Sequence, residues 1–149
     1  SLITFDGREY TLDYRAAGRP ADYQMQIHAP ESVAADRTGE TDIVVNVFNG
    51  SERSTVEMRV DDAAEWQPMS HHVAEDPEYR RMYDREMALK DRSWRDPARP
   101  GKSTHLWRAA LPAELSPGVH TIQVRTTDMH GRTFTDRRVL RVEDTGAKP

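Results

Sequence analysis

The sequence has no cysteine among its 149 residues. This absence excludes disulfide bonds, thiolate catalysis and cysteine-ligated zinc. The chain also has no apolar run near the ~20 residues of a membrane-spanning helix, and no basic segment followed by an apolar stretch, which is the form of a signal peptide. Its 21 basic residues are outnumbered by 25 acidic ones, which gives a net charge of −4. Because nucleic-acid-binding modules carry a basic excess, we expect no nucleic-acid partner and no membrane span.

Motifs for catalysis are missing as well. Gly50–Ser54 is too short to be a phosphate-binding loop and lacks the lysine that follows in such loops. No grouping of serine, histidine and aspartate is recognisable, and the acidic residues are scattered. The acidic pair Asp61–Asp62, at the end of an expected strand, is expected to be solvated. The sequence therefore predicts no catalytic residue and no cofactor-binding residue in this chain.

The sequence does contain short segments in which apolar and polar residues alternate between turns. A chain of this length suits one domain, and the alternation favours antiparallel strands. The strands are expected at residues 3–5, 10–14, 23–27, 43–48, 56–60, 106–111, 120–126 and 134–142, with a polar loop at 31–41. Asp6–Gly7 and Asn49–Gly50 are residue pairs typical of tight turns, so each predicts a hairpin.

The centre of the sequence differs from this pattern. Asp76-Pro77-Glu78 is a typical helix start, with an acidic N-cap and a proline in the first turn. The apolar residues that follow recur at helical spacing and predict a helix over roughly 77–92, inside an insertion over about 70–102. We therefore predict a mostly β fold: an immunoglobulin-like antiparallel β-sandwich over residues 1–143 with one helix-bearing insertion, followed by a disordered tail over 144–149.

Two histidine-containing motifs could ligate a metal, and for both a structural interpretation is favoured. Asp128-Met129-His130 offers a carboxylate and an imidazole, but it lies between two alternating strands before a glycine and is typical of a hairpin turn. His71-His72 is an adjacent pair, whose side chains point apart on a strand. We expect it to lie in a polar loop that leads into the helix. The sequence therefore predicts no metal ligand.

Aromatic and methionine side chains supply the candidate interaction surface. The helical stripe could be a core contact or could dock on a neighbouring domain, and the sequence leaves both open. Among the tryptophans, Trp107 is expected in the core, Trp66 against the insertion, and Trp94 exposed in a charged loop. An exposed tryptophan can stack on sugars, so a carbohydrate- or cell-surface-binding module is the alternative function. The candidate surface consists of Tyr79, Met82, Tyr83, Met87 and Trp94.

Several segments resemble a known family. They are Gly50–Val60, Ser103–Arg108, Pro117–Arg125 and Thr127–Phe134, and the likeness extends from about Phe5 to Glu143. Together they are similar to the C-terminal domain of bacterial calcineurin-like metallophosphoesterases. In that family the domain follows a separate catalytic domain whose metal-binding blocks are Asp-x-His, Gly-Asp, Gly-Asn-His and Gly-His-x-His. This chain lacks the last three blocks, and its single Asp-x-His comes near the end.

The resemblance implies an accessory domain of a hydrolase rather than an enzyme in this chain. It implies that the partner is the metallophosphoesterase domain of the parent protein, that the divalent metals lie in that domain, and that a periplasmic or extracellular location is plausible. A glycan is the alternative ligand. The chain starts at Ser1 without methionine and enters patterned sequence almost at once, so we expect it to be part of a longer protein.

Overall fold

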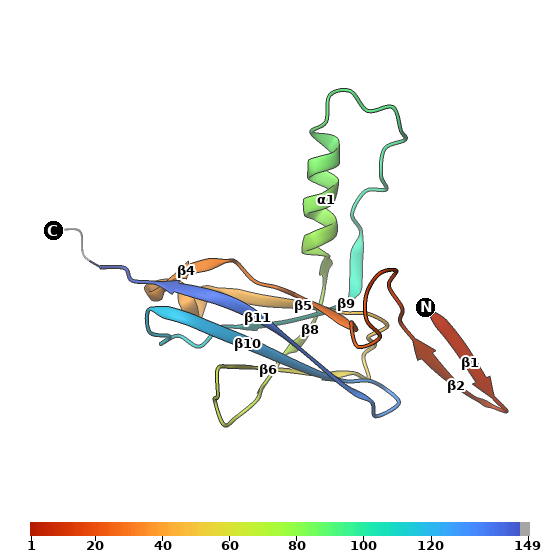
Figure 1. Cartoon of the computed structure of the whole chain (residues 1–149), viewed down its shortest axis with the longest axis horizontal. Helices are drawn as coiled ribbons and strands as arrows, with labels where there is room; N and C mark the ends of the chain where they lie inside the picture. Colours follow the sequence, from red (N-terminus) through yellow and green to blue (C-terminus); the bar gives the residue numbers. More distant parts are fainter. Residues whose placement is uncertain (147–149) are drawn as a thin grey trace.

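The computed structural model describes residues 1–146, in which a five-stranded and a four-stranded sheet pack face to face beside a separate two-stranded sheet (Figure 1). The first sheet has the order β4 (Ser32–Ala34), β11 (Thr133–Glu143), β10 (Gly118–Thr127), β6 (Thr55–Val60) and β7 (Gln67–Pro68). The second has the order β3 (Met25–His28), β5 (Asp42–Val47), β9 (Lys102–Ala110) and β8 (Ser70–Glu75). The pairing is antiparallel except between β4 and β11. The predicted mostly β sandwich is confirmed.

The core lies between the two sheets and is made by alternate residues of their strands. In β6 and β10 every second residue is buried, and the register places Met58 opposite Val124 on the same inner face. Trp107 from β9 is only 2 % exposed, as predicted. Burying such side chains is the main stabilising term of the fold. The largest completely buried apolar side chains of this core are Met25, Ile43, Met58, Ile122 and Leu140.

The predicted hairpin at Asn49–Gly50 is wrong. β5 and β6 belong to different sheets, so residues 48–54 cross from one sheet to the other. Gly50 makes this crossing possible, because its Cα lies so close to the Trp107 ring that an added Cβ would be 2.7 Å from a ring carbon. Alternation along β5 and β6 looks the same whether the strands pair or face each other across a core, and for this reason the sequence pattern misled the prediction.

Three further segments differ from expectation. Residues 31–41 are not a loop: they contain β4 and a 3₁₀ helix, η1 (Ala35–Glu40), whose Thr38 hydroxyl donates to the carbonyl of Ala113 at 2.8 Å. His71-His72 lies in edge strand β8, so the insertion begins after residue 75 rather than at about 70. The helix α1 (Pro77–Met87) ends at residue 87, short of 92. β4 is too short for a clear alternation, and β8 has no buried side chain to mark it as a strand.

Residues 144–146 have no regular secondary structure, and residues 147–149 of the expected tail lie outside the described residues. Within residues 1–146, no helix combines the length and the apolar character needed to cross a membrane.

An ion pair joins β10 to the turn after β6. His120 is buried, and its ring contacts two acceptors: Asp61 Oδ2 at 2.7 Å and the Ser116 carbonyl oxygen at 2.7 Å. Because both partners accept, both ring nitrogens donate, and this arrangement raises the pKa of His120 above its ordinary value. Burial alone would raise the pKa of Asp61, but hydrogen bonds from the Thr121 N–H and from His120 lower it. The Asp61 side chain is 47 % exposed and so remains in contact with solvent, as expected, but its carboxylate also accepts these two hydrogen bonds.

The first prediction concerns the crossing. Gly50→Ala should lower the free energy of unfolding by about 1–3 kcal/mol, because the new methyl group must push Trp107 out of its packed position. Urea denaturation monitored by tryptophan fluorescence measures the change. Gly101→Ala is the matched control, because no atom lies within 4 Å of the added Cβ. Equal stability of the two variants would contradict the role given to Gly50.

The second prediction concerns pH. A raised pKa in the folded state means that His120 stabilises the protein fully below its unfolded pKa of about 6.5, and that this contribution disappears as pH rises through the folded value. The unfolding free energy of the wild type should therefore fall as pH rises above about 6.5. The His120→Asn variant should lack that decline, whereas His72→Asn, on edge strand β8, should keep it. Denaturation at a series of pH values measures this, and parallel curves for wild type and His120→Asn would contradict it.

Candidate functional site: two elements that leave the sandwich

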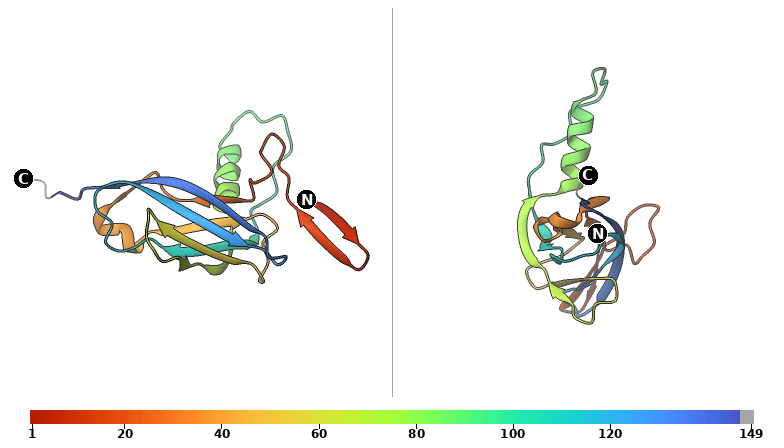
Figure 2. Two further views of the ribbon diagram at one scale, coloured as in Figure 1. Left: turned by 60° about the horizontal axis from the view of Figure 1, so that its bottom comes forward. Right: turned by 90° about the vertical axis from the view of Figure 1, so that its left-hand side faces the viewer.

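The helix α1 and the return segment 88–101 stand off the sandwich (Figures 1 and 2). Asp76 fixes the start of the helix to the second sheet. Its Oδ1 accepts the Tyr79 backbone N–H at 2.7 Å, and its Oδ2 accepts from Asn46 Nδ2 at 2.6 Å and lies 3.6 Å from His28 Nε2. Burial would raise the pKa of Asp76, but these partners lower it to about 2. The helix is therefore anchored at one end only.

Three candidate residues of the insertion, Tyr79, Tyr83 and Trp94, make contacts within it. The Tyr79 hydroxyl donates to the Ala98 carbonyl at 2.7 Å, and the Trp94 indole N–H donates to Glu86 Oε2 at 3.2 Å, so these two side chains tie the return segment to the helix. Tyr83 is half-buried, with the Arg80 guanidinium 5.8 Å from the centre of its ring.

The apolar remainder of the insertion faces solvent in the described structure. Met82 is 41 % exposed, Met87 39 % and Trp94 54 %, and no side chain of α1 is buried within residues 1–146. Leu89, which the sequence analysis did not select, is exposed beside them. The stripe is therefore not a contact with the sandwich core, which leaves the insertion with an uncovered apolar surface.

A second element leaves the sandwich at the N-terminal end. Within residues 1–146, β1 (Leu2–Asp6) and β2 (Glu9–Asp13) pair only with each other, around the predicted Asp6–Gly7 turn. The register places Phe5 opposite Tyr10 and Ile3 opposite Leu12, so these four side chains share one face of the hairpin. Phe5 is 73 % exposed and Ile3 56 %. The sequence predicted both strands but not their separation from the sandwich, because alternation does not reveal what covers a face.

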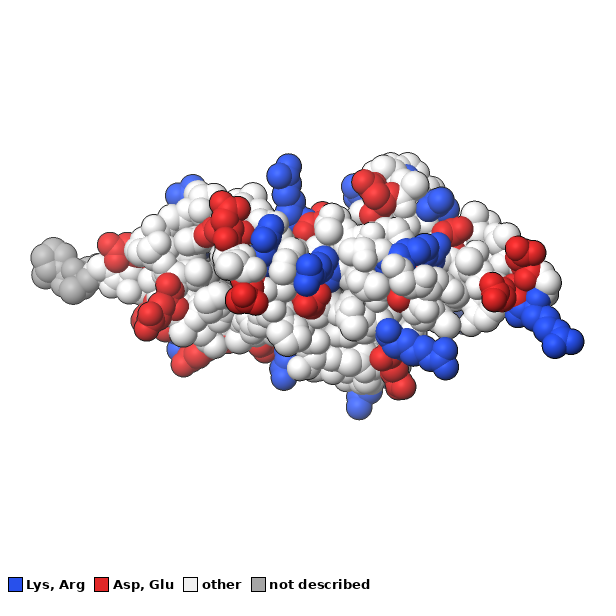
Figure 3. Space-filling view, turned by 90° about the horizontal axis from the view of Figure 1, so that it is seen from below, with Lys and Arg blue, Asp and Glu red and all other residues white. Residues whose placement is uncertain are grey.

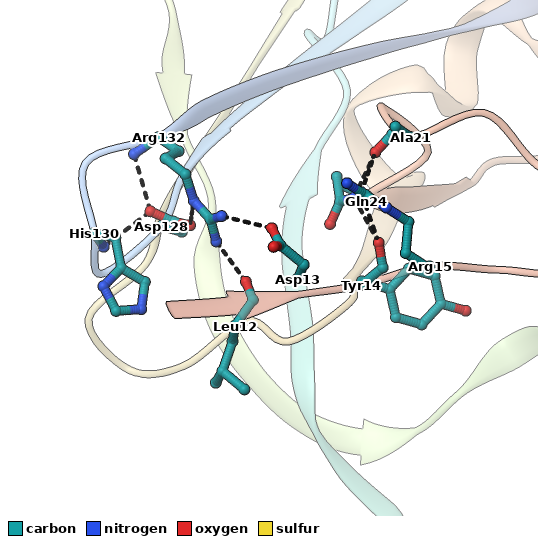
Figure 4. A network of polar contacts seen from close by, with 9 residues as sticks. All are labelled: Leu12, Asp13, Tyr14, Arg15, Ala21, Gln24, Asp128, His130 and Arg132. Atoms are coloured by element: carbon teal, nitrogen blue, oxygen red, sulfur yellow. Dashed lines mark hydrogen bonds and ion pairs between the residues drawn. The ribbon is translucent and has the colours of Figure 1, made fainter. Parts of the chain in front are cut away.

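Arg132 clasps this hairpin to the end of the sandwich (Figure 4). Its Nη1 donates to Asp13 Oδ1 at 2.8 Å and its Nη2 to the Leu12 carbonyl at 2.5 Å. On the other side its Nε donates to Asp128 Oδ2 at 2.7 Å. The ring of His130 adds an edge contact to Tyr10, with centroids 5.8 Å apart. Such multiple charge-assisted hydrogen bonds fix orientation as well as position.

The motif Asp128-Met129-His130 forms the turn between β10 and β11, as predicted. Asp128 Oδ1 accepts the backbone N–H groups of His130 and Arg132, both at 2.9 Å, while Oδ2 accepts from the Arg132 side chain. Both carboxylate oxygens are thus engaged with donors. Among residues 1–146, no group of three or more His, Asp or Glu side chains is arranged to hold a metal ion. The residues present therefore do not fit the two-metal centre of a phosphoesterase.

The remaining candidates have structural partners or lie apart. His71 Nε2 is 2.7 Å from the Thr104 carbonyl oxygen. Trp66 does not contact the insertion, contrary to expectation. It lies on the outer face of the first sheet, with the guanidinium carbons of Arg59 and Arg125 4.7 and 4.4 Å from its ring centroid. Because Trp94 is in the insertion and Trp107 is in the core, the three tryptophans do not form one stacking platform.

The charged residues do not define a site on the face drawn in Figure 3. Basic and acidic side chains are interspersed there, and neither sign occupies a broad area. Many charged residues of the described chain are paired, for example Arg125 with Glu57 at 2.7 Å across β10 and β6. Such exposed pairs contribute little stability individually. Apolar exposure on the two protruding elements is therefore the distinctive surface feature of residues 1–146.

The third prediction tests the clasp. Arg132→Lys removes the forked contact to Asp13, Leu12 and Asp128, so the paired amides of β1 and β2 should exchange with deuterium about tenfold faster or more. Hydrogen–deuterium exchange with mass spectrometry measures residues 2–13 separately from the sandwich. Arg137→Lys, on the exposed side of β11, is the control. Unchanged exchange in the hairpin would show that other contacts hold it.

Comparison with known proteins gives one family match. A family model described as the C terminal of calcineurin-like phosphoesterase matches residues 1–134. No curated protein matches the sequence. Among solved structures, the crystal structure of CopC from Methylosinus trichosporium OB3b is similar with a TM-score of 0.41 and 11 % identity, over 83 % of this chain and 95 % of that one. A TM-score this low carries no argument about fold or function. The family match covers most of the chain, and the chain therefore belongs to the C-terminal domain family of calcineurin-like phosphoesterases.

Proposed function

We propose that this chain is a non-catalytic accessory domain that packs on the metallophosphoesterase domain of its parent protein. The observation that supports the proposal is the uncovered apolar surface on the two protruding elements, the α1 insertion and the N-terminal hairpin. Exposed apolar side chains gathered on protruding elements mark protein–protein contacts. Because the family forms the C-terminal part of phosphoesterases, the partner in this proposal is the catalytic domain of the same protein.

The α1 insertion suits a docking element because its internal contacts already order it. Asp76 anchors the first turn, and the contacts of Tyr79 and Trp94 hold the return segment against the helix. Met82 and Met87 are both exposed, although the Met87 Sδ also accepts from Arg92 Nη1 at 3.3 Å. Methionine adapts well to irregular apolar surfaces. Preorganisation reduces the entropy lost on association. We assign Tyr79, Met82, Tyr83, Met87 and Trp94 to this interface.

The N-terminal hairpin suits the same role for a thermodynamic reason. A two-stranded hairpin alone is at best marginally stable in water, and it becomes stable when one face packs on another body. The face formed by Ile3, Phe5, Tyr10 and Leu12 is largely uncovered by residues 1–146. In a C-terminal domain the hairpin is also the element that follows the preceding domain in sequence, so the two bodies are held at high effective concentration.

The titratable groups support a structural rather than a chemical role. The pKa of Asp76 is lowered by the contacts that cap α1, and the pKa of Asp128 by the contacts that close a turn. His120 and Asp61 join a strand to a turn. Within residues 1–146, none of these groups has a hydroxyl nucleophile as a hydrogen-bond partner, which a serine- or threonine-based active site would need. The divalent metals and the hydrolysis belong to the partner domain under this proposal.

The fourth prediction tests docking. Met82→Ser with Met87→Ser, and separately Phe5→Ser with Ile3→Ser, should each weaken binding to the separately expressed catalytic domain about tenfold or more, because buried apolar anchors dominate such interfaces. Isothermal titration calorimetry measures the dissociation constant. Val139→Ser is the control, because Val139 is 60 % exposed on the outer face of β11.

The outcomes separate the parts of the proposal. Loss of binding with only one pair of substitutions assigns the interface to that element alone. Binding that is equal for all variants would refute both elements as the interface. Absence of binding by the wild type, together with unchanged activity of the parent after deletion of this domain, would refute the accessory role itself.

A further inference from the structure

A small cavity lies where the N-terminal hairpin joins the sandwich. Its volume is about 20 Å³. Residues from several separate parts of the chain line it, among them Leu12 from β2, Asn49 from the crossing between the sheets, Thr126 from β10, and His130 from the turn that also includes the Arg132 clasp. The cavity is therefore placed at the joint on which the orientation of the hairpin depends.

Three of the residues that line this cavity share an unusual property. In residues 1–146, five buried side-chain nitrogen or oxygen atoms make no hydrogen bond to another protein group. Three of the five belong to residues that line this one cavity: Asn49 Nδ2, Thr126 Oγ1 and His130 Nε2. The Thr126 residue is only 1 % exposed. Buried polar groups in native proteins almost always have a partner, so three unpaired groups on one cavity point to a ligand.

The volume and the donor set identify that ligand. A cavity needs about 10–15 Å³ to hold one water molecule, and buried waters typically make about three hydrogen bonds. A metal ion does not fit, because an amide nitrogen such as Asn49 Nδ2 donates and cannot ligate. We propose that the cavity binds one ordered water molecule, which accepts a hydrogen bond from Asn49 Nδ2 and makes hydrogen bonds with Thr126 Oγ1 and His130 Nε2.

This water links three elements through polar atoms that make no direct hydrogen bond to one another. It joins the crossing loop, a core strand of the first sheet, and the turn that contacts the hairpin through His130 and Arg132. Asn49 also accepts from the Ser1 hydroxyl through Oδ1 at 2.7 Å, so both ends of its amide are used. The water stiffens the hairpin joint whether or not the hairpin docks on a catalytic domain.

The test uses the sign of a stability change. Thr126→Val keeps the shape of the side chain and removes its hydroxyl. If water occupies the cavity, the substitution takes a partner from that water, and the melting temperature of the chain should fall by about 2–4 °C. If the cavity is dry, the same substitution removes an unpaired buried hydroxyl, and the melting temperature should rise. Thr135→Val, exposed on β11, gives the baseline for this exchange in a strand.

A crystal structure of the wild-type chain provides the second measurement. The proposal expects density for one water within about 3.2 Å of all three polar atoms. A rise in melting temperature for Thr126→Val relative to Thr135→Val, or an empty cavity in the electron density, would overturn it. Thr126→Ser keeps the hydroxyl and removes only the methyl group, so the same water should be present in its crystal structure.

Discussion

The contact between Trp107 and Gly50 is the packing constraint on which the arrangement of the two sheets depends. The tryptophan from β9 lies so close to the crossing that only a residue without a side chain fits there. The position is reinforced by His105, whose Nδ1 is 2.6 Å from the Gly50 carbonyl oxygen. With the crossing held in this way, β5 and β6 face each other across the core, and the small cavity and the hairpin joint form beside the same loop.

Much of this fold could be predicted because its strands bury every second residue. The alternation of Val56, Met58 and Val60 indicates a strand with one buried face, and the structure has that strand. The same alternation cannot say which sheet a strand joins, and the crossing at Asn49–Gly50 was therefore mistaken for a hairpin. Whether residues 49–50 form a hairpin or a crossing depends on the contact of Gly50 with Trp107, which lies far away in sequence. Edge strands such as β8 were missed for a related reason, since few of their side chains are buried.

The candidate surface was only partly predictable from the sequence. Helical spacing was sufficient to find Met82 and Met87, because a short helix displays its periodicity in the sequence alone. The internal roles of Tyr79 and Trp94 were not predictable, since they arise from hydrogen bonds between the helix and a return segment without regular structure. Arg132 was also missed. It is one of many arginines in the sequence, and its contacts with Leu12 and Asp13 become visible only when the two ends of the chain are folded together.

The N-terminal hairpin has a consequence for the isolated chain. Each of its strands has one neighbour only, so each leaves a row of backbone N–H and C=O groups on its outer edge. The sandwich protects its own edges with short strands, among them β7, which contains Pro68. The hairpin has charged residues at its tip, including Asp6 and Glu9, but Ile3 and Phe5 lie along its length. Separated from a covering partner, this edge is a template for strand addition by another copy, so aggregation of the free domain would begin here.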